Sequence, residues 1–383
     1  MSARGPQSNE ALMNWSFKLT RAAGIDIYVH WTFFLLLAWV AYEYNRAGGS
    51  LLVVAEGVAF VLALFGCVVL HELGHALTAR RYGVQTRDIV LLPIGGVARM
   101  ERIPEAPMQE FWVAVAGPAV NIVIAVLLFG LLEGFGRIGE AGNISLVGGP
   151  FLARLMWVNV ALVVFNMLPA FPMDGGRVLR ALLATQMTRL KATRIAVAVG
   201  KVMAVGFGLL GVFSGQWMLL LIALFVFTGA KAEVQAVETR ALLDGVRVRD
   251  VMSTNFRVVE QSDPLSAVVR SAAPRQRDFP VSDAGEIVGL LAYPDLVSAL
   301  DRGAAELPVG EIMRREYPSA DPNEALETAI GRMQLAKSSA LLAVSNGDVV
   351  GLLSAEMINR WLTATAATPD HPHPATPPAL EQS

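Results

Sequence analysis

The chain has 383 residues, of which 54% are hydrophobic and 17% are charged, and its mean hydropathy is +0.48. This composition is too apolar for an ordinary soluble protein. The formal net charge is −2 and no basic stripe is present, which argues against a nucleic-acid partner. The single cysteine, Cys67, excludes an intramolecular disulfide.

Residues 1–20 form a polar N-terminal arm that lacks the apolar run and cleavage site of a signal peptide. Six apolar stretches follow, each near the ~20 residues that a helix needs to cross a bilayer. They cover residues 27–44, 51–79, 108–132, 151–168, 193–213 and 216–236. The predicted fold is therefore an α-helical polytopic membrane protein with about six transmembrane helices, and the lipid bilayer is a partner.

Lysine and arginine residues are concentrated before the first stretch and after the second, fourth and sixth stretches. Loops rich in these residues stay in the cytoplasm. Both termini, and the C-terminal end of the second stretch, are therefore expected on the cytoplasmic side of the cell membrane.

The second stretch ends in His71-Glu72-Leu-Gly-His75, where polar side chains at the edge of the hydrocarbon are costly. Residues four apart share a helix face, so both histidines can reach one metal while Glu72 stands beside a metal-bound water. This is the HExxH arrangement of metallohydrolases. The alternative interpretation is a buried polar patch that packs two helices together.

A catalytic zinc needs a third protein ligand. Cys67 is one candidate, but it lies deeper in the membrane, and a lone cysteine in an apolar run is usually a core residue. Asp174 is the other candidate, because it follows a proline-interrupted segment on the same side of the membrane. Gly175-Gly176 is expected to make the turn that aims its carboxylate. Alternatively, Asp174 caps a cytoplasmic turn.

Two motifs together, HELGH and Asn166-Met-Leu-Pro-Ala-Phe-Pro-Met-Asp174-Gly, resemble those of the site-2 protease family of intramembrane zinc metalloproteases. Gly117-Pro-Ala-Val-Asn121 and Leu-Pro-Ile-Gly95-Gly96 are similar to further motifs of that family. The resemblance covers about residues 20–240. It implies one Zn²⁺ per chain, bound by the two histidines and Asp174, with the glutamate between them as the catalytic residue.

Residues 84–99 combine strand-like residues with Pro and Gly and predict a short membrane-associated β segment. This segment either pairs with an extended substrate by strand addition or merely closes the site. Gly95, Gly96 and Asn166 are therefore substrate-binding candidates. Asn121 lies in the middle of a predicted span, where it either donates to the oxyanion or makes an interhelical hydrogen bond.

Beyond Arg240 the long apolar runs end and an internal repeat begins. Val248-Arg-Asp-Val-Met252 recurs 61 residues later as Val309-Gly-Glu-Ile-Met313. Each repeat is expected to form strand, helix, strand, Gly turn, strand and helix. The pair resembles tandem CBS modules, an α/β domain.

The CBS resemblance implies either an adenosine-nucleotide sensor for ATP, ADP or AMP, or a homodimerisation module. The family's hydroxyl and ribose-contacting aspartate are each present once, as Ser354 in the second repeat and Asp295 in the first. These two residues are the nucleotide-binding candidates.

The predicted domains are the arm, an intramembrane metalloprotease domain, two CBS repeats and a Pro- and Ala-rich disordered tail. Their boundaries are 1–20, 21–240, 241–303, 304–363 and 364–383.

The predicted activity is that of a zinc-dependent metalloendopeptidase that cuts a transmembrane protein substrate in or near its span. This reaction is regulated intramembrane proteolysis, and by the resemblance the cell is prokaryotic. The alternative is a CBS-regulated divalent-metal transporter, because intramembrane His and carboxylate groups also mark ion paths. A hydrolase needs a non-ligand carboxylate such as Glu72, whereas a transport path favours sites at successive depths.

Overall fold

The computed structural model describes residues 15–93, 95–100, 104, 106–141, 150–271 and 276–366. The chain divides into two compact units, Met1–Gln235 and Ala236–Ser383. The predicted disordered tail lies outside the described residues from residue 367 onward, and residues 364–366 belong to a helix.

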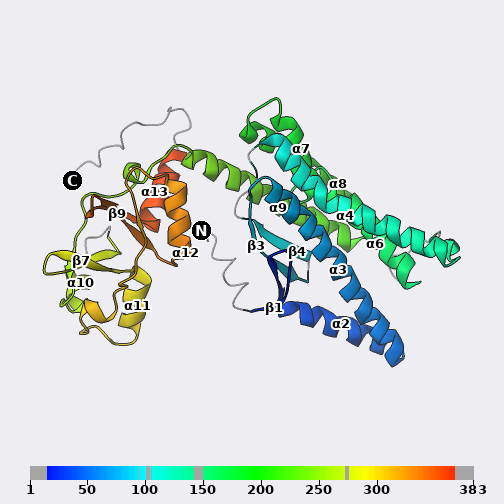
Figure 1. Cartoon of the computed structure of the whole chain (residues 1–383), viewed down its shortest axis with the longest axis horizontal. Coiled ribbons are helices and arrows are strands. Elements are labelled where there is room, and N and C mark those ends of the chain that lie inside the picture. The colour runs from blue at the N-terminus through cyan, green and yellow to red at the C-terminus, as the bar shows by residue number, and fades with distance from the viewer. Residues whose placement is uncertain are drawn as a thin grey trace. The chain divides into compact units, whose positions relative to one another are not determined.

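The first unit consists mainly of helices, which confirms the polytopic helical fold (Figure 1). The helices are α2 (Thr32–Arg46), α3 (Leu51–Arg81), α4 (Pro107–Gly134), α5 (Ile138–Ala141), α6 (Phe151–Asn166), α7 (Asp174–Ala184), α8 (Arg189–Ser214) and α9 (Trp217–Leu243). Four of these helices, α3, α4, α8 and α9, are long and apolar enough to cross a membrane. Because α6 has 16 residues and α2 has 15, each is shorter than the ~30 Å hydrocarbon core at ~1.5 Å per residue. The count of six spans is therefore approximate.

The first unit also contains a four-stranded sheet in the order β1-β2-β3-β4. Its strands are β1 (Ser16–Ala22), β2 (Ile25–His30), β3 (Thr86–Leu92) and β4 (Gly95–Met100). The antiparallel pair β3–β4 confirms the predicted β segment. The prediction that residue 27 already belongs to a spanning helix is wrong, because Ile25, Ile27 and Val29 alternate inward on β2 and pack against α3.

The second unit contains two repeats of the predicted order. The first repeat comprises β5 (Val259–Glu260), α10 (Leu265–Ser271), β6 (Phe279–Asp283), β7 (Glu286–Leu291) and α11 (Tyr293–Asp301). The second comprises β8 (Ser319–Ala320), α12 (Leu326–Leu335), β9 (Ala340–Ser345), β10 (Asp348–Ser354) and α13 (Ala355–Ala366). Each repeat has its own three-stranded sheet, β5-β6-β7 or β10-β9-β8.

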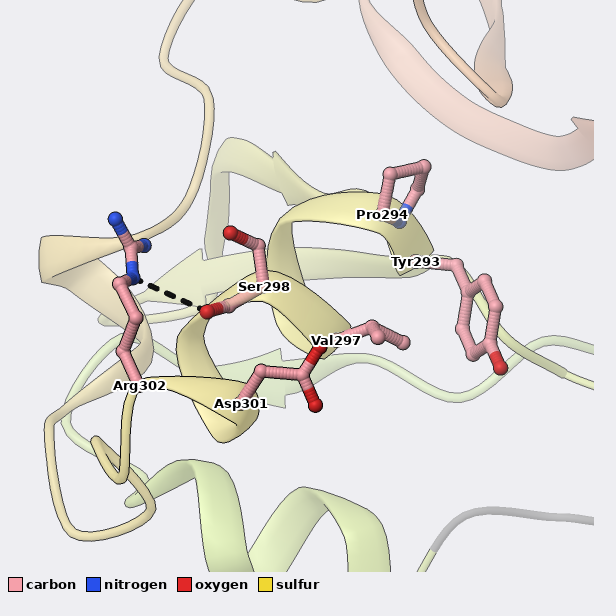
Figure 2. A pocket seen from close by; sticks show the side chains of 6 residues that line it. All are labelled: Tyr293, Pro294, Val297, Ser298, Asp301 and Arg302. Atoms are coloured by element: carbon pink, nitrogen blue, oxygen red, sulfur yellow. Dashed lines mark hydrogen bonds between the residues drawn. The ribbon is translucent and has the colours of Figure 1, made fainter.

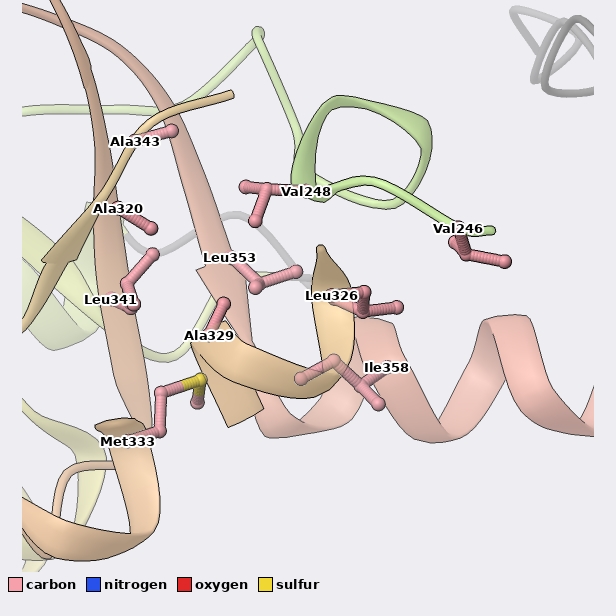
Figure 3. Close-up of a cluster of buried hydrophobic side chains, with 10 residues drawn as sticks. All are labelled: Val246, Val248, Ala320, Leu326, Ala329, Met333, Leu341, Ala343, Leu353 and Ile358. Atoms are coloured by element: carbon pink, nitrogen blue, oxygen red, sulfur yellow. The ribbon is translucent and has the colours of Figure 1, made fainter. Parts of the chain in front are cut away.

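The segment that opens each repeat packs into the core of the other repeat. Val246 and Val248 lie in the segment that leads into β5 of the first repeat. Both are nevertheless buried against Leu326, Leu341 and Leu353 of the second repeat (Figure 3). In Figure 3 the two valines lie on the green segment, and the other labelled side chains come from the orange and red elements. Neither core is therefore complete without residues from the other half of the pair.

The reciprocal exchange places Val309 and Met313, which open the second repeat, in the core of the first. Two backbone bridges accompany each exchange. Arg247 pairs with Ala325 and Ser253 with Leu352 in one case, and Pro264 pairs with Pro308 and Leu290 with Arg314 in the other. The predicted boundary between residues 303 and 304 thus separates the repeats in sequence, while their cores are shared.

Candidate metal centre

Helix α3 carries His71, Glu72 and His75 near its C-terminal end. The two histidines are buried, with 7% and 3% of their surface exposed. Their rings meet edge to face, with centroids 4.7 Å apart, as expected for side chains one turn apart on one face. Glu72 is less buried and lies one residue along the helix from the first histidine.

Asp174 comes from a different part of the chain and is the first residue of α7. It follows the non-helical residues 167–173, which interrupt the helical path between α6 and α7. Its side chain is buried, with 8% of the residue exposed. The interruption therefore lets the chain return to the depth of the two histidines with a carboxylate at a helix start.

The prediction that Gly175 and Gly176 make a turn is wrong, because both residues are helical and neither has a positive φ. Instead, the two glycines allow α7 to lie close to the backbone of the preceding segment. A Cβ on Gly176 would lie 2.7 Å from the carbonyl carbon of Ala170, and a Cβ on Gly175 would overlap the backbone of Met167 and Leu168. Only glycine therefore lets the first turn of α7 pack on the segment that precedes it.

The three predicted ligand residues meet at one point. The Nε2 atoms of His71 and His75 are 3.1 Å apart, and Asp174 Oδ2 lies 3.3 and 3.2 Å from them. Zinc–ligand bonds of about 2.0–2.1 Å at tetrahedral angles put ligand atoms about 3.3–3.4 Å apart. The triangle has the size and the donor set, two imidazole nitrogens and one carboxylate oxygen, that suit a zinc ion.

The other ring nitrogens of the histidines are occupied by protein groups. His75 Nδ1 donates to the carbonyl oxygen of Val113 over 2.7 Å, and His71 Nδ1 donates to Asn121 Oδ1 over 2.5 Å. A carbonyl can only accept, so each proton sits on Nδ1 and each Nε2 lone pair faces the triangle. Both bonds come from α4, which therefore orients the histidines of α3.

Glycines bring α3 and α4 close enough for these bonds. A Cβ on Gly74 would lie 2.8 Å from the Ala116 carbonyl oxygen, and a Cβ on Gly117 would overlap the imidazoles of His71 and His75. Small residues at helix contacts are the usual means of close packing in membranes. The Gly117-containing motif thus leaves room for the ligand side chains.

Glu72 lies outside the ligand triangle, on the side where β4 passes. A Cβ on Gly96 would lie 2.8 Å from Glu72 Cγ, so the backbone of β4 runs directly against this glutamate. Gly95, the preceding residue, has a φ of +138°, which favours glycine. The predicted β segment therefore borders the residue that was predicted to be catalytic.

The structure does not bring the remaining candidates into the triangle. Asn121 is fully buried, and its Nδ2 donates to Asn159 Oδ1 over 2.7 Å. Asn166 is half-buried at the end of α6. Cys67 packs in an apolar cluster and accepts a hydrogen bond from Asn159 Nδ2 over 3.4 Å. Among the described residues, the ligand group that could hold a metal contains Asp174 and lacks this cysteine.

Sequence reasoning missed a buried ion cluster beside the site. Arg180 of α7 is fully buried and donates to Glu110 Oε1 over 2.8 and 2.5 Å, and also to Glu233 of α9. Arg189 Nη2 lies 3.3 Å from Glu110 Oε2. The cluster ties the ligand-bearing helix α7 to its neighbours. The one available signal was the single acidic residue near the start of the apolar stretch 108–132.

The nucleotide candidates in the second unit are engaged by protein groups. Asp295 accepts two hydrogen bonds from Arg314, over 2.6 and 3.1 Å, and this pairing raises the pKa of Arg314. Ser354 Oγ accepts from the backbone nitrogen of Met357 over 3.3 Å at the start of α13. Neither residue lines the hollow on α11 shown in Figure 2. That hollow is lined by Tyr293, Pro294, Val297, Ser298, Asp301 and Arg302.

Comparison with known proteins identifies both units. The sequence model of Peptidase family M50 matches residues 59–138 and 137–207, and that of the CBS domain matches residues 248–302 and 309–364. A zinc metalloprotease of Methanocaldococcus jannaschii is 33% identical over 352 residues, which cover 92% of this chain and 97% of the relative. The chain belongs to peptidase family M50.

A putative zinc metalloprotease of Synechocystis is similar to this M50 chain at 28% identity, over 93% of the chain and 97% of the relative. The solved structure of the site-2 protease from Methanocaldococcus jannaschii is 39% identical over 57% of this chain and 95% of that chain, with a TM-score of 0.43. The resemblance to site-2 proteases with tandem CBS modules is confirmed. This M50 protein is an intramembrane zinc metalloprotease, and the family assignment favours the protease over the metal transporter.

Proposed function

We propose that His71, His75 and Asp174 bind the catalytic zinc ion and that Glu72 is the proton-transferring residue of an HExxH endopeptidase. The observation that carries this proposal is the triangle of ligand atoms, with sides of 3.1, 3.2 and 3.3 Å and both Nε2 lone pairs directed inward. When bound, zinc activates a water molecule and polarises the peptide carbonyl.

The protein's own contribution to the chemistry begins with Glu72. Its carboxylate belongs to the same helix turn as the ligands, yet it is not one of the three ligand groups. From there it takes the proton of the attacking water and delivers it to the leaving amine. Asn121 holds the ring of His71, since both ends of its amide are already hydrogen bonded.

The substrate is a transmembrane protein that must present an extended backbone. A helix hides its carbonyl groups in hydrogen bonds between residues four apart, so the span is unwound before attack. Strand β4 is the last strand in the sheet order and runs against Glu72 at Gly96. An unpaired strand edge accepts a further strand. The substrate backbone would then add to β4 beside the catalytic glutamate, with Gly95 as part of that strand and Asn166 as a further substrate-binding candidate.

The cleavage site lies toward the cytoplasmic leaflet of a prokaryotic cell membrane in this proposal. The supporting observation is the distribution of Lys and Arg, which favours a cytoplasmic position for both termini and the CBS unit. Cleavage there would release a cytosolic fragment of the substrate.

The variant Glu72→Gln tests the proposal. It should abolish cleavage of a transmembrane reporter substrate in detergent or nanodiscs, while about one zinc per chain is retained. The matched control is Glu56→Gln, which changes a half-exposed glutamate on the same helix and should leave cleavage intact. Cleavage that persists in Glu72→Gln would refute the assigned role, and zinc lost with cleavage would make the glutamate a ligand.

For the second unit, we propose adenosine-nucleotide binding that regulates the protease, with Asp295 and Ser354 as contacts. A nucleotide must compete with the Arg314 side chain for Asp295, so weak binding is expected. Equilibrium binding of ATP, ADP and AMP to the full chain tests this, with Asp295→Ala as the weakened variant. If none of the three binds, the pair is a dimerisation module, which the molecular mass in detergent would show.

A further inference from the structure

A row of hydrogen bonds continues from the metal centre beyond Asn121 and ends on α6. His71 Nδ1 donates to Asn121 Oδ1, and Asn121 Nδ2 donates to Asn159 Oδ1 over 2.7 Å. Asn159 Nδ2 then donates to the carbonyl oxygen of Leu155 over 2.9 Å. Both asparagines are fully buried, with 0% of their surface exposed.

The direction of this row is decided at its far end. An asparagine amide has nearly the same shape after a 180° rotation, which exchanges its oxygen and its nitrogen. The Leu155 carbonyl can only accept, so it holds the nitrogen end of Asn159 and turns the oxygen of Asn159 toward Asn121. That oxygen in turn holds the nitrogen end of Asn121, which leaves Asn121 Oδ1 facing His71.

The rotated form of Asn121 would be harmful to the proposed metal site. Its NH₂ group would then face His71 Nδ1 and require that nitrogen to be the acceptor. The neutral imidazole would carry its proton on Nε2, which is the atom that points at His75 and Asp174. A protonated Nε2 has no lone pair to offer a metal.

We propose that Asn159 is a positioning residue, which fixes the amide of Asn121 so that the proton of His71 stays on Nδ1 and Nε2 remains free for zinc. The inference rests on the proposed metal site. Asn159 is not one of the three ligand groups, and its hydrogen bond toward the site goes to Asn121, so it acts through that residue. Its contact with Cys67 Sγ, at 3.4 Å, is the longer of its two donor contacts and does not set the direction.

The test is the zinc affinity of the full chain in detergent, measured by competition with a chromophoric chelator. Asn159→Leu removes the acceptor for Asn121 and should weaken zinc binding about tenfold, the lower end of the 10–100-fold effect of outer-shell partners. Asn159→Asp keeps an acceptor oxygen for Asn121 but loses the donor to the Leu155 carbonyl, so it should bind zinc more tightly than Asn159→Leu and more weakly than the native chain. Cleavage by Asn159→Leu should recover when zinc is raised, because the defect lies in occupancy.

A second background separates orientation from general damage. In Asn121→Asp both side-chain oxygens can accept from His71, so rotation no longer matters. Adding Asn159→Leu to that background should therefore have much less effect on zinc affinity than in the native background. If the leucine variant does not fold, Asn159→Ala replaces it. The control is Thr193→Val, which removes another fully buried polar group, bonded to the Arg189 carbonyl, and should leave zinc affinity unchanged.

The outcomes distinguish this inference from the metal site itself. If His71→Ala loses zinc while Asn159→Leu and Asn159→Ala bind it as tightly as the native chain, the positioning role is overturned and the metal site stands. An equal loss for Asn159→Leu in both backgrounds would also overturn it. If His71→Ala keeps its zinc, the proposed metal site fails.

Discussion

The two units of the chain distribute their polar side chains in opposite ways. In the first unit, which is the membrane unit, polar groups such as Asn121, Asn159 and Arg180 are fully buried. Large apolar side chains such as Phe213 and Trp217 are 85% and 80% exposed there. In the CBS unit the fully buried side chains are aliphatic or aromatic, such as Leu341 and Phe279. Lipid accepts apolar surface as readily as a protein interior does, so only the second unit gains a large hydrophobic driving force from burial.

The difference shows what to look for in each region. Burial of apolar surface identifies the residues that stabilise the CBS unit, at roughly 25 cal/mol per Å². In the membrane unit, buried polar groups are costly unless they are paired, and they mark function or specific helix contacts. Substitutions of buried polar groups in the membrane unit and of buried side chains in the CBS unit test this difference. The predictions follow in order of decreasing effect.

Removal of a ligand should have the largest effect. Asp174→Ala should lose zinc and all measurable proteolysis, since two histidines alone leave the site one protein ligand short. The paired variant Cys67→Ala should keep about one zinc per chain, because this cysteine packs among apolar side chains. Zinc content after purification without chelator measures both. Loss of zinc from the cysteine variant alone would assign the third ligand to Cys67.

Added volume at the contact of α3 and α4 should come next. Gly117→Ala places a methyl group against the imidazoles of His71 and His75, so we expect about 1–3 kcal/mol of destabilisation and weaker zinc binding. Gly130→Ala on the same helix has nothing within 4 Å of the new methyl group and should behave like the native chain. Thermal unfolding and zinc titration of the two variants give the comparison, and equal results would show that α4 tolerates movement at the site.

A cavity in the CBS unit should affect stability without affecting the metal. Leu353→Ala removes a fully buried side chain and should lower the free energy of unfolding of this unit by about 2–5 kcal/mol. Leu335→Ala changes a leucine that is 67% exposed and should have little effect. Denaturant unfolding measures the difference, and zinc content should be the same in both. Zinc loss in Leu353→Ala would contradict the separation of the two units.

The smallest effect concerns one buried carboxyl group. Burial raises the pKa of Asp278, against the hydrogen bonds that it accepts from Ser339 and the Tyr293 backbone. The folded state therefore holds the proton more tightly than the unfolded state, and stability falls as pH rises through the raised pKa. Asp278→Asn should be modestly more stable than the native chain at pH 7.

The same variant should lose its advantage below about pH 4, the usual pKa of an aspartate, where the native carboxyl is protonated in both states. Unfolding midpoints across this pH range check the prediction. Asp283→Asn, an exposed change at the far end of β6, the strand that follows Asp278, is the control and should give no pH-dependent gain. A gain for Asp278→Asn that is equal at both pH values would point to packing rather than charge.

Local patterns predicted much of this arrangement. The spacing of His71 and His75 predicted that they share one face of a helix, and the predicted topology brought Asp174 near them. In the structure the Asp174 carboxylate lies beside both imidazoles. The repeat in the second unit followed from its period alone. These features depend on short stretches of sequence or on a regular spacing.

The parts that sequence did not reveal depend on contacts between distant segments. Asn159 and Arg180 look like isolated polar residues until α4 is placed beside α6 and α7. Strand β2 was not predicted, because its apolar residues Ile25, Ile27 and Val29 suit a strand as well as a helix. The exchange of Val248 between repeats could not be seen either, because both repeats carry the same residue type at this position.

The exchanged segments also impose an order on biosynthesis. Val246 and Val248 leave the ribosome soon after α9, but the core that receives them is not finished until Leu353 has been made. During that interval these two apolar side chains cannot be buried in their native core. A chain that ends after the first repeat would leave both cores incomplete. The two repeats must therefore be encoded and translated together. A fusion protein that contains a single repeat should be insoluble.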